Sequence, residues 1–119
     1  MMRRPRKDAA MRTFSEFQII GHVGKVRSVG PTLRVDVAAE YGRKDDAGQF
    51  QSNPYWNEVT LFNERVIAWA KDHVKTGDLV HVRGTLRQTR YEKDGQTIYG
   101  VTLAADDFDL LAPKAQVGA

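Results

Sequence analysis

Residues 55–87 read YWNEVTLFNERVIAWAKDHVKTGDLVHVRGTLR and combine two kinds of pattern. In residues 55–62 and 79–91, apolar and polar side chains alternate, which is typical of strands with one buried face. Between these runs, Asn63 can cap a helix and Gly77 suits the left-handed residue that ends one. An apolar stripe at helical spacing fills the interval (Val66, Ile67, Ala70 and Val74). The stretch therefore predicts a strand, a helix and a second strand.

Three further strand-like runs lie outside this stretch, at residues 17–26, 32–41 and 97–105. The polar residues 42–53 are expected to form a mobile loop. Three strands, one helix and two strands give the order of the all-β OB-fold, a five-stranded Greek-key barrel with one α-helix between strands three and four. A mixed sheet with one packed helix fits the same order. Turn signals separate the runs at Gly30-Pro31, Asp46-Ala47-Gly48 and Asp94-Gly95.

The alternation also predicts a single core. The 119 residues suffice for one domain, which we expect over residues 14–112, followed by a short flexible C-terminus at residues 113–119. The residues expected to point inward are Phe17, Ile19, Gly21, Val23, Leu33, Val35, Val37, Ala39, Val59, Leu61, Val80, Val82, Gly84 and Leu86.

Composition excludes several classes of function. The chain has no cysteine, which excludes a disulfide framework, thiolate zinc sites and a cysteine nucleophile. Three scattered histidines give no basis for a metal site, and we expect neither a metal nor a cofactor. The longest apolar run, residues 66–70, is far too short to cross a membrane. We therefore expect a small cytoplasmic protein without membrane contact.

The positive charge is concentrated at the N-terminus. The net charge is +3, from 18 basic and 15 acidic residues. Residues 1–13 hold five basic groups and one acid, or +4, so residues 14–119 carry 13 basic and 14 acidic groups, or −1. The arm can be a solvated flexible tail or a contact for phosphates, whereas a targeting peptide fits it least. Met11 can also be the true start of the chain.

The run at residues 55–62 carries two large aromatic side chains on its outward face. Val59 and Leu61 share the inward parity, while Trp56, Glu58, Thr60 and Phe62 share the other. A solvated face has no evident use for a Trp and a Phe. These rings therefore either stack on a ligand or pack beneath a loop or another subunit.

Basic side chains accompany further aromatic rings elsewhere. The outward parity of residues 79–91 brings two arginines together with an aromatic ring, and a similar cluster lies at the base of the polar loop. A single nucleic-acid strand is bound by such an arrangement, because cations pair with phosphates and rings stack on bases of any sequence. The residues expected to contact phosphates are Arg43, Lys44, Arg83, Arg87, Arg90 and Lys93, beside the rings of Tyr41 and Tyr91.

Catalysis is not expected from this sequence. It contains no Ser-His-Asp order, HExxH, Walker loop or GxGxxG. Acidic residues cluster in the polar loop (Asp45 and Asp46) and where the last strand is expected to end (Asp106, Asp107 and Asp109). The histidines fit structural or solvent-exposed positions (His22, His73 and His81). A metal-dependent OB-fold hydrolase that uses the second acidic cluster is the alternative from another class.

Four segments together resemble the bacterial single-stranded DNA-binding proteins. The segments are IIGHVG at residues 19–24, YWNEVTLF at 55–62, KTGDLVHVRGTLR at 75–87 and the hairpin with Gly95-Gln96 and Ile98-Tyr99, so the resemblance extends over residues 17–111. It implies an OB barrel that binds single-stranded DNA in replication, recombination or repair. It also implies that four aromatic positions stack bases: Tyr41, Trp56, Phe62 and Tyr91.

The same resemblance implies an assembly and a cellular setting. Members of the family commonly form homotetramers, so we expect a tetramer, or a dimer, in the bacterial cytoplasm at the nucleoid. The sequence lacks the acidic C-terminal tail of the main replicative members, and Trp69 stands where a smaller apolar residue is expected. A tail-less accessory or mobile-element member fits these departures. A primosomal replication protein, an OB-fold relative that acts with the restart machinery, fits them too.

Overall fold

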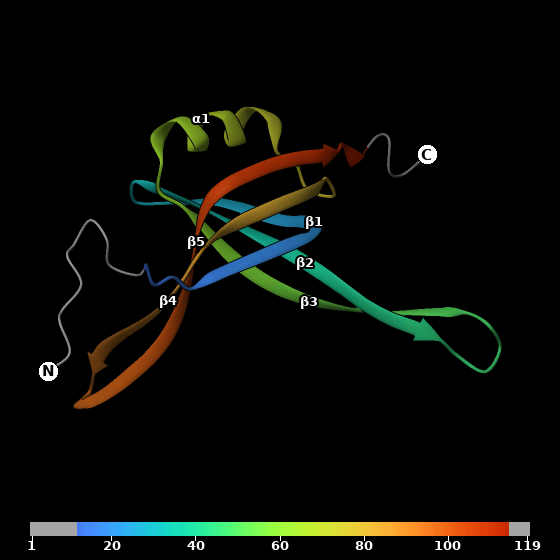
Figure 1. The fold of residues 1–119 in the computed structure, drawn as a ribbon, viewed down its shortest axis with the longest axis horizontal. Helices are drawn as coiled ribbons and strands as arrows, with labels where there is room; N and C mark the ends of the chain where they lie inside the picture. The colour runs from blue at the N-terminus through green and yellow to red at the C-terminus, as the bar shows by residue number, and fades with distance from the viewer. Residues whose placement is uncertain (1–11, 115–119) are drawn as a thin grey trace, which may run out of the picture.

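The computed structural model describes residues 12–114, which fold into five strands and one helix (Figure 1). The strands close into a barrel in the order β1-β2-β3-β5-β4, and β3 pairs with β5 in parallel. This confirms the predicted all-β OB-fold. The basic arm at residues 1–13 and the C-terminus at residues 113–119 lie almost wholly outside the described residues. The elements are β1 (Glu16–Val29), β2 (Thr32–Lys44), β3 (Phe50–Leu61), α1 (Glu64–His73), β4 (Leu79–Lys93) and β5 (Gln96–Ala112).

The barrel interior holds the residues that the alternation assigned to it, except Ala39 and Leu86. Ala39 is only partly buried, whereas its neighbour Ala38 is buried. Leu86 is 40% exposed, because β4 stops pairing with β1 at Thr85 and continues beyond the barrel. The helix α1 contributes Ile67 and Ala70 to the same core. The large side chains that are fully buried are Leu33, Val35, Val37, Val59, Leu61, Val80 and Val82.

The helix begins as predicted but ends early. Asn63 caps it, because the side-chain oxygen accepts hydrogen bonds from two backbone N–H groups of the first turn at 2.9 and 3.2 Å. The helix ends at His73 rather than at the predicted Gly77, which lies at a φ of 94° in the next turn. Asp78 holds that turn, since its buried carboxylate accepts from the backbone N–H of Lys75 at 2.8 Å.

The loop predicted at residues 42–53 is wrong, because most of it is a β-hairpin. β2 runs to Lys44, β3 begins at Phe50, and their register is continuous down to the Lys44–Phe50 pair. The hairpin projects from the barrel (Figure 1), and all of its residues from Tyr41 to Trp56 are exposed. A strand pair with two solvated faces needs no apolar alternation, which is why the sequence resembles a loop there.

The β4–β5 hairpin projects from the opposite side of the barrel (Figure 1). Asp94 and Gly95 form its turn with φ values of 53° and 77°, as the Asp-Gly signal predicted. β5 is much longer than expected and continues to Ala112. Asp106 and Asp109 therefore lie inside β5, and the expectation that the last strand ends at this acidic cluster is wrong.

Candidate nucleic-acid interface

Trp56 lies on the outer face of β3 and is 59% exposed. Its indole extends across β2 to β1 and lies close over Gly24. If residue 24 had a Cβ, that atom would be only 2.5 Å from the ring atom Cζ3, which is too close for a real contact. Ala38, the register partner of Trp56 on β2, is small and buried. The indole is thus supported by backbone from two neighbouring strands while more than half of the side chain stays open to solvent.

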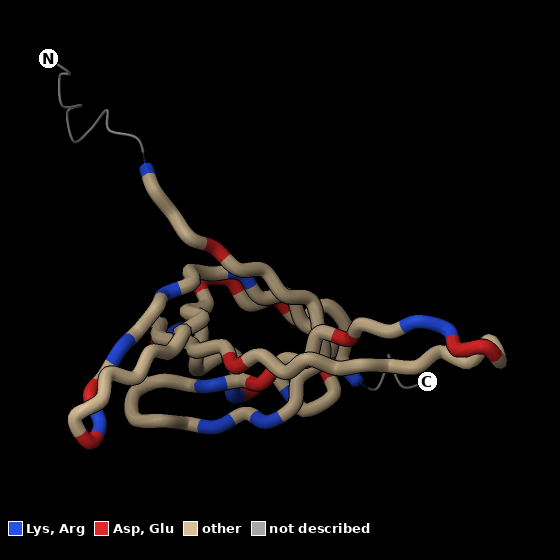
Figure 2. The backbone as a smooth tube through the Cα atoms, turned by 90° about the horizontal axis from the view of Figure 1, so that it is seen from below, with Lys and Arg blue, Asp and Glu red and all other residues tan. Residues whose placement is uncertain are grey.

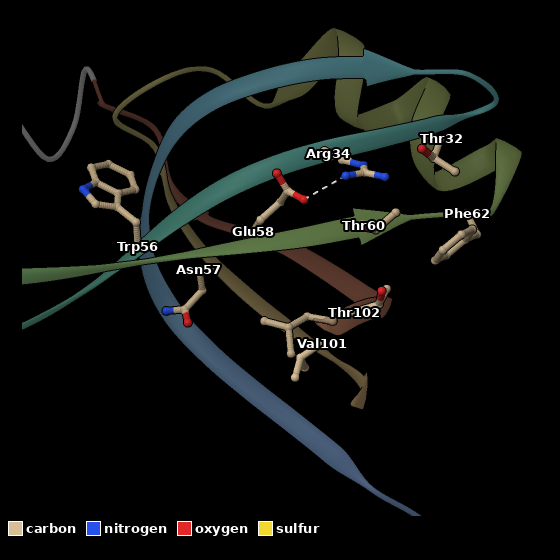
Figure 3. A pocket seen from close by; sticks show the side chains of 10 residues that line it. Thr32, Arg34, Trp56, Asn57, Glu58, Thr60, Phe62, Val101 and Thr102 are labelled. Atoms are coloured by element: carbon tan, nitrogen blue, oxygen red, sulfur yellow. Dashed lines mark hydrogen bonds and ion pairs between the residues drawn. The ribbon is translucent and has the colours of Figure 1, made fainter. Parts of the chain in front are cut away.

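Two arginines beside Trp56 share a single carboxylate. Glu58, two residues along β3, accepts a hydrogen bond from Arg34 of β2 at 3.1 Å (Figure 3) and a second one from Arg27 of β1. Arg27 and Arg34 are register partners, so both guanidinium groups lie side by side. Among these three side chains, two positive charges face one negative charge, and several guanidinium N–H donors stay unused. Asp36, the register partner of Glu58, adds a second carboxylate on the same face. A phosphate is the complement of such a group.

Phe62 follows the end of β3 on the same face as Trp56 and Glu58, and it is 52% exposed. A groove of about 460 Å³ connects Phe62 to Trp56 along β3 (Figure 3). Arg34 and Glu58 form one wall, and Val101 of β5 lies on the other side. The outer face of β1, β2 and β3 therefore presents two rings with the guanidinium groups of Arg27 and Arg34 between them. We call it the ring face, defined by Arg27, Arg34, Trp56, Glu58 and Phe62.

Tyr41 lies on the opposite side of the β2–β3 hairpin from Trp56. It pairs in register with Asn53, and its ring meets that of Tyr55 edge to face with centroids 5.6 Å apart. Arg43 shares the side of Tyr41, whereas Lys44 shares the side of Trp56. The cluster predicted here is therefore divided between two faces.

The β4–β5 hairpin also divides its predicted residues. Arg87, Tyr91 and Lys93 share one face, while Arg90 lies on the other, opposite Tyr99. Nearer the barrel, Arg83 lies 3.7 Å from the carboxylate of Asp107, its register partner. His81 and Asp109 form a similar pair at 3.3 Å. We call the face with these two pairs the paired face.

Arg27 and Arg34 are site residues that the sequence did not reveal. The alternation places Arg34 outward, but only the register of β2 and β3 brings Glu58 and the rings beside it. The second acidic cluster is divided, because Asp106 lies on the other side of β5 from Asp107 and Asp109, which both contact basic side chains. Within residues 12–114, no group of three His, Cys, Asp or Glu side chains could hold a metal ion. In the same part of the chain, no helix has the length and apolar character to span a bilayer.

A family model described as the single-strand binding protein family matches residues 14–111. The chain belongs to this family. The single-stranded DNA-binding protein of Thermus aquaticus is 29% identical over 84 residues, which are 71% of this chain and 31% of that protein. Single-stranded DNA-binding protein 2 of Streptococcus agalactiae is 48% identical over 40 residues, or 34% of this chain and 30% of that protein. The matches therefore cover about a third of the length of these curated relatives.

Solved structures of the single-strand binding protein family have the same fold. The mitochondrial single-stranded DNA-binding protein Rim1 of S. cerevisiae is 26% identical with a TM-score of 0.62, and the match covers 85% of this chain and 98% of Rim1. The SSB of Plasmodium falciparum, solved with single-stranded DNA, has a TM-score of 0.66 at 14% identity, over 86% of this chain and 98% of that one. At that identity the similarity shows the OB-fold alone. The family resemblance predicted from the sequence is confirmed.

Proposed function

We propose that the chain binds single-stranded DNA with little sequence preference, through the ring face. Bases stack on Trp56 and Phe62, and phosphates pair with Arg27 and Arg34. The observation that carries the proposal is that two exposed rings flank a pair of guanidinium groups held by one carboxylate. Every base has a π-face, so stacking of this kind tolerates any sequence. Membership in the single-strand binding protein family supports the same conclusion.

Secondary contacts extend from the two hairpins. Arg87, Tyr91 and Lys93 offer cations and a ring on one face of the β4–β5 hairpin, with no ion pair to any residue between 12 and 114. Arg83 contributes less, because Asp107 already balances its charge. The other expected contacts are weaker candidates for the ring face. Tyr41, Arg43 and Arg90 lie on other faces, and Lys44 lies on the side of Trp56 but far out along the β2–β3 hairpin.

We propose a non-catalytic role in protecting single strands during replication, recombination or repair in the bacterial cytoplasm. A single OB fold covers about 4–16 nucleotides, so association of several barrels would lengthen the binding path. We propose a homotetramer, with a dimer as the alternative. Light scattering at micromolar concentration is expected to report about four chain masses, and a single mass of 13.4 kDa contradicts both assemblies.

A titration of labelled oligo(dT) with the purified chain tests the proposed function. We expect saturable binding whose log K falls with log salt at a slope of about −0.7 for each phosphate contacted. Oligo(dT) and a mixed-sequence oligomer are expected to bind within a small factor of each other. Absence of binding at low salt contradicts the proposal and favours a primosomal subunit that acts through protein contacts.

A further inference from the structure

Three exposed rings recur at equal intervals on one side of β3. Phe50, Trp56 and Phe62 are each six residues apart, so they share one parity of the strand, and they are 62%, 59% and 52% exposed. At a rise of about 3.3 Å per residue, six residues span about 20 Å. Phe50 and Phe62 thus lie at equal distances from Trp56 along the strand. Phe50 lies on the side of the β2–β3 hairpin turn.

Phe50 is also seated in the same way as Trp56. A Cβ placed on Gly42 would come within 2.5 Å of the Phe50 ring atom Cζ, and one on Gly24 would come equally close to the indole of Trp56. Neither glycine has a positive φ, so the backbone conformation does not require glycine at these positions. A glycine inside a strand marks a close approach by another group. In both places that group is an exposed aromatic ring.

The end of the hairpin holds Phe50 in a defined position. Asp45 accepts hydrogen bonds from the backbone N–H of Gln49 at 2.9 Å and from the side-chain amide of Gln51 at 3.0 Å. These bonds also lower the pKa of Asp45, the backbone bond most strongly. Lys44 is the register partner of Phe50 and places a cation on the same side.

We infer that Phe50 is a further base-stacking residue, which extends the DNA path from Trp56 along the β2–β3 hairpin, with Lys44 as its phosphate contact. This inference rests on the proposed function of the ring face. A ring already held against the backbone loses little freedom when a base stacks on it. The inference also makes Phe50, rather than the Tyr41–Tyr55 pair on the other side, the ring of this hairpin that meets the same DNA strand as Trp56.

The test compares Phe50→Ala with Tyr41→Ala, a matched control on the opposite side of the same hairpin with a similar exposure of 66%. Both variants are titrated with dT oligomers of about 6 and about 16 nucleotides, lengths within the range that one OB fold covers. We expect Phe50→Ala to weaken binding of the longer oligomer by about 5- to 150-fold, as loss of one stacked base implies. The shorter oligomer can lie across the Trp56–Phe62 interval without Phe50, so it is expected to bind as before. Tyr41→Ala is expected to change affinity less than Phe50→Ala.

Trp56→Ala, measured beside these variants, separates the inference from the proposed function. If Trp56→Ala weakens binding and Phe50→Ala does not at either length, the inference is wrong while the proposed function stands. If neither variant weakens binding, both are wrong. A larger loss in Tyr41→Ala than in Phe50→Ala also overturns the inference.

Tryptophan fluorescence tests the stacking of residue 50 independently of affinity. With Phe50→Trp introduced into a Trp56→Phe, Trp69→Phe background, the only indole stands at residue 50. Stacking on the longer dT oligomer is expected to quench its fluorescence. An unquenched indole at saturation, with melting close to that of the parent, contradicts a stacking role at this position.

Discussion

The ring face and the paired face both present basic side chains on the outside of one barrel, but their charges are arranged differently. On the ring face, Arg27 and Arg34 share Glu58, so these three side chains together carry one surplus positive charge. On the paired face, Arg83 meets Asp107 and His81 meets Asp109, so each basic group has its own carboxylate. Figure 2 shows basic and acidic residues intermixed along the backbone, with no single basic stripe.

Cross-strand partners, rather than the number of basic residues, therefore determine where a phosphate can bind on this barrel. The chain between residues 14 and 119 has a net charge of −1, so no general positive field attracts DNA to this barrel. Instead, we expect the guanidinium groups beside the exposed rings to attract DNA locally.

Trp56→Ala is expected to have the largest effect on binding. Loss of a stacked base weakens affinity by about 1–3 kcal/mol, or about 5- to 150-fold, and leaves folding nearly intact because the ring is mostly exposed. Oligo(dT) titration and thermal melting measure the two quantities. Leu111→Ala removes an equally exposed apolar side chain at the far end of β5 and serves as the control. A melting temperature many degrees lower with unchanged affinity would show that Trp56 is a core or interface residue.

Arg34→Met and Arg83→Met form a matched pair for the two faces. Removing Arg34 leaves Glu58 balanced by Arg27 alone, so the surplus charge is gone. We expect the salt slope to become less steep by about 0.7, which equals about fivefold in affinity for each tenfold change in salt. Arg83→Met is expected to leave the slope unchanged, because Asp107 already neutralises this guanidinium. Equal effects of the two substitutions would remove the distinction between the faces.

Gly24→Ala is expected to lower the affinity for DNA by a smaller factor, and only when Trp56 is present. The added Cβ would lie 2.5 Å from the indole, so the ring must move from its seat on β1. We expect affinity for oligo(dT) to fall by about twofold or more, the effect of about 0.5 kcal/mol. In a Trp56→Ala background the same substitution is expected to change nothing further. A loss that persists without the indole would show that Gly24 acts on the backbone rather than on the ring.

Most of the fold could be predicted from the sequence, because alternation and turn residues report local geometry. The Asp94-Gly95 turn and the Asn63 cap are such local signals. The β2–β3 hairpin was not predicted, since its strands lie in solvent on both faces and carry no apolar pattern. The early end of α1 was missed too, because it depends on the carboxylate of Asp78 in the following turn.

The candidate site was predictable only in part. The parity of Trp56 and Phe62 was sufficient to place both on one outward face. The same alternation also places Tyr41 on the parity of Val35 and Val37, and so on the other side of the hairpin from Trp56. The grouping of Arg27, Arg34 and Glu58 required the register of three strands, which the sequence does not encode locally.

The most direct test of the ring face is the fluorescence of Trp56 in a Trp69→Phe protein during titration with oligo(dT). Trp69 of α1 packs against Phe108 and is the only other Trp in the sequence, so its replacement leaves the Trp56 indole as the sole reporter. Anisotropy of labelled oligo(dT) fixes the point of saturation independently. We predict that the indole emission is quenched in step with binding and that salt reverses both signals together. Full binding by anisotropy with unchanged emission from Trp56 would contradict the assignment of single-stranded DNA to this face.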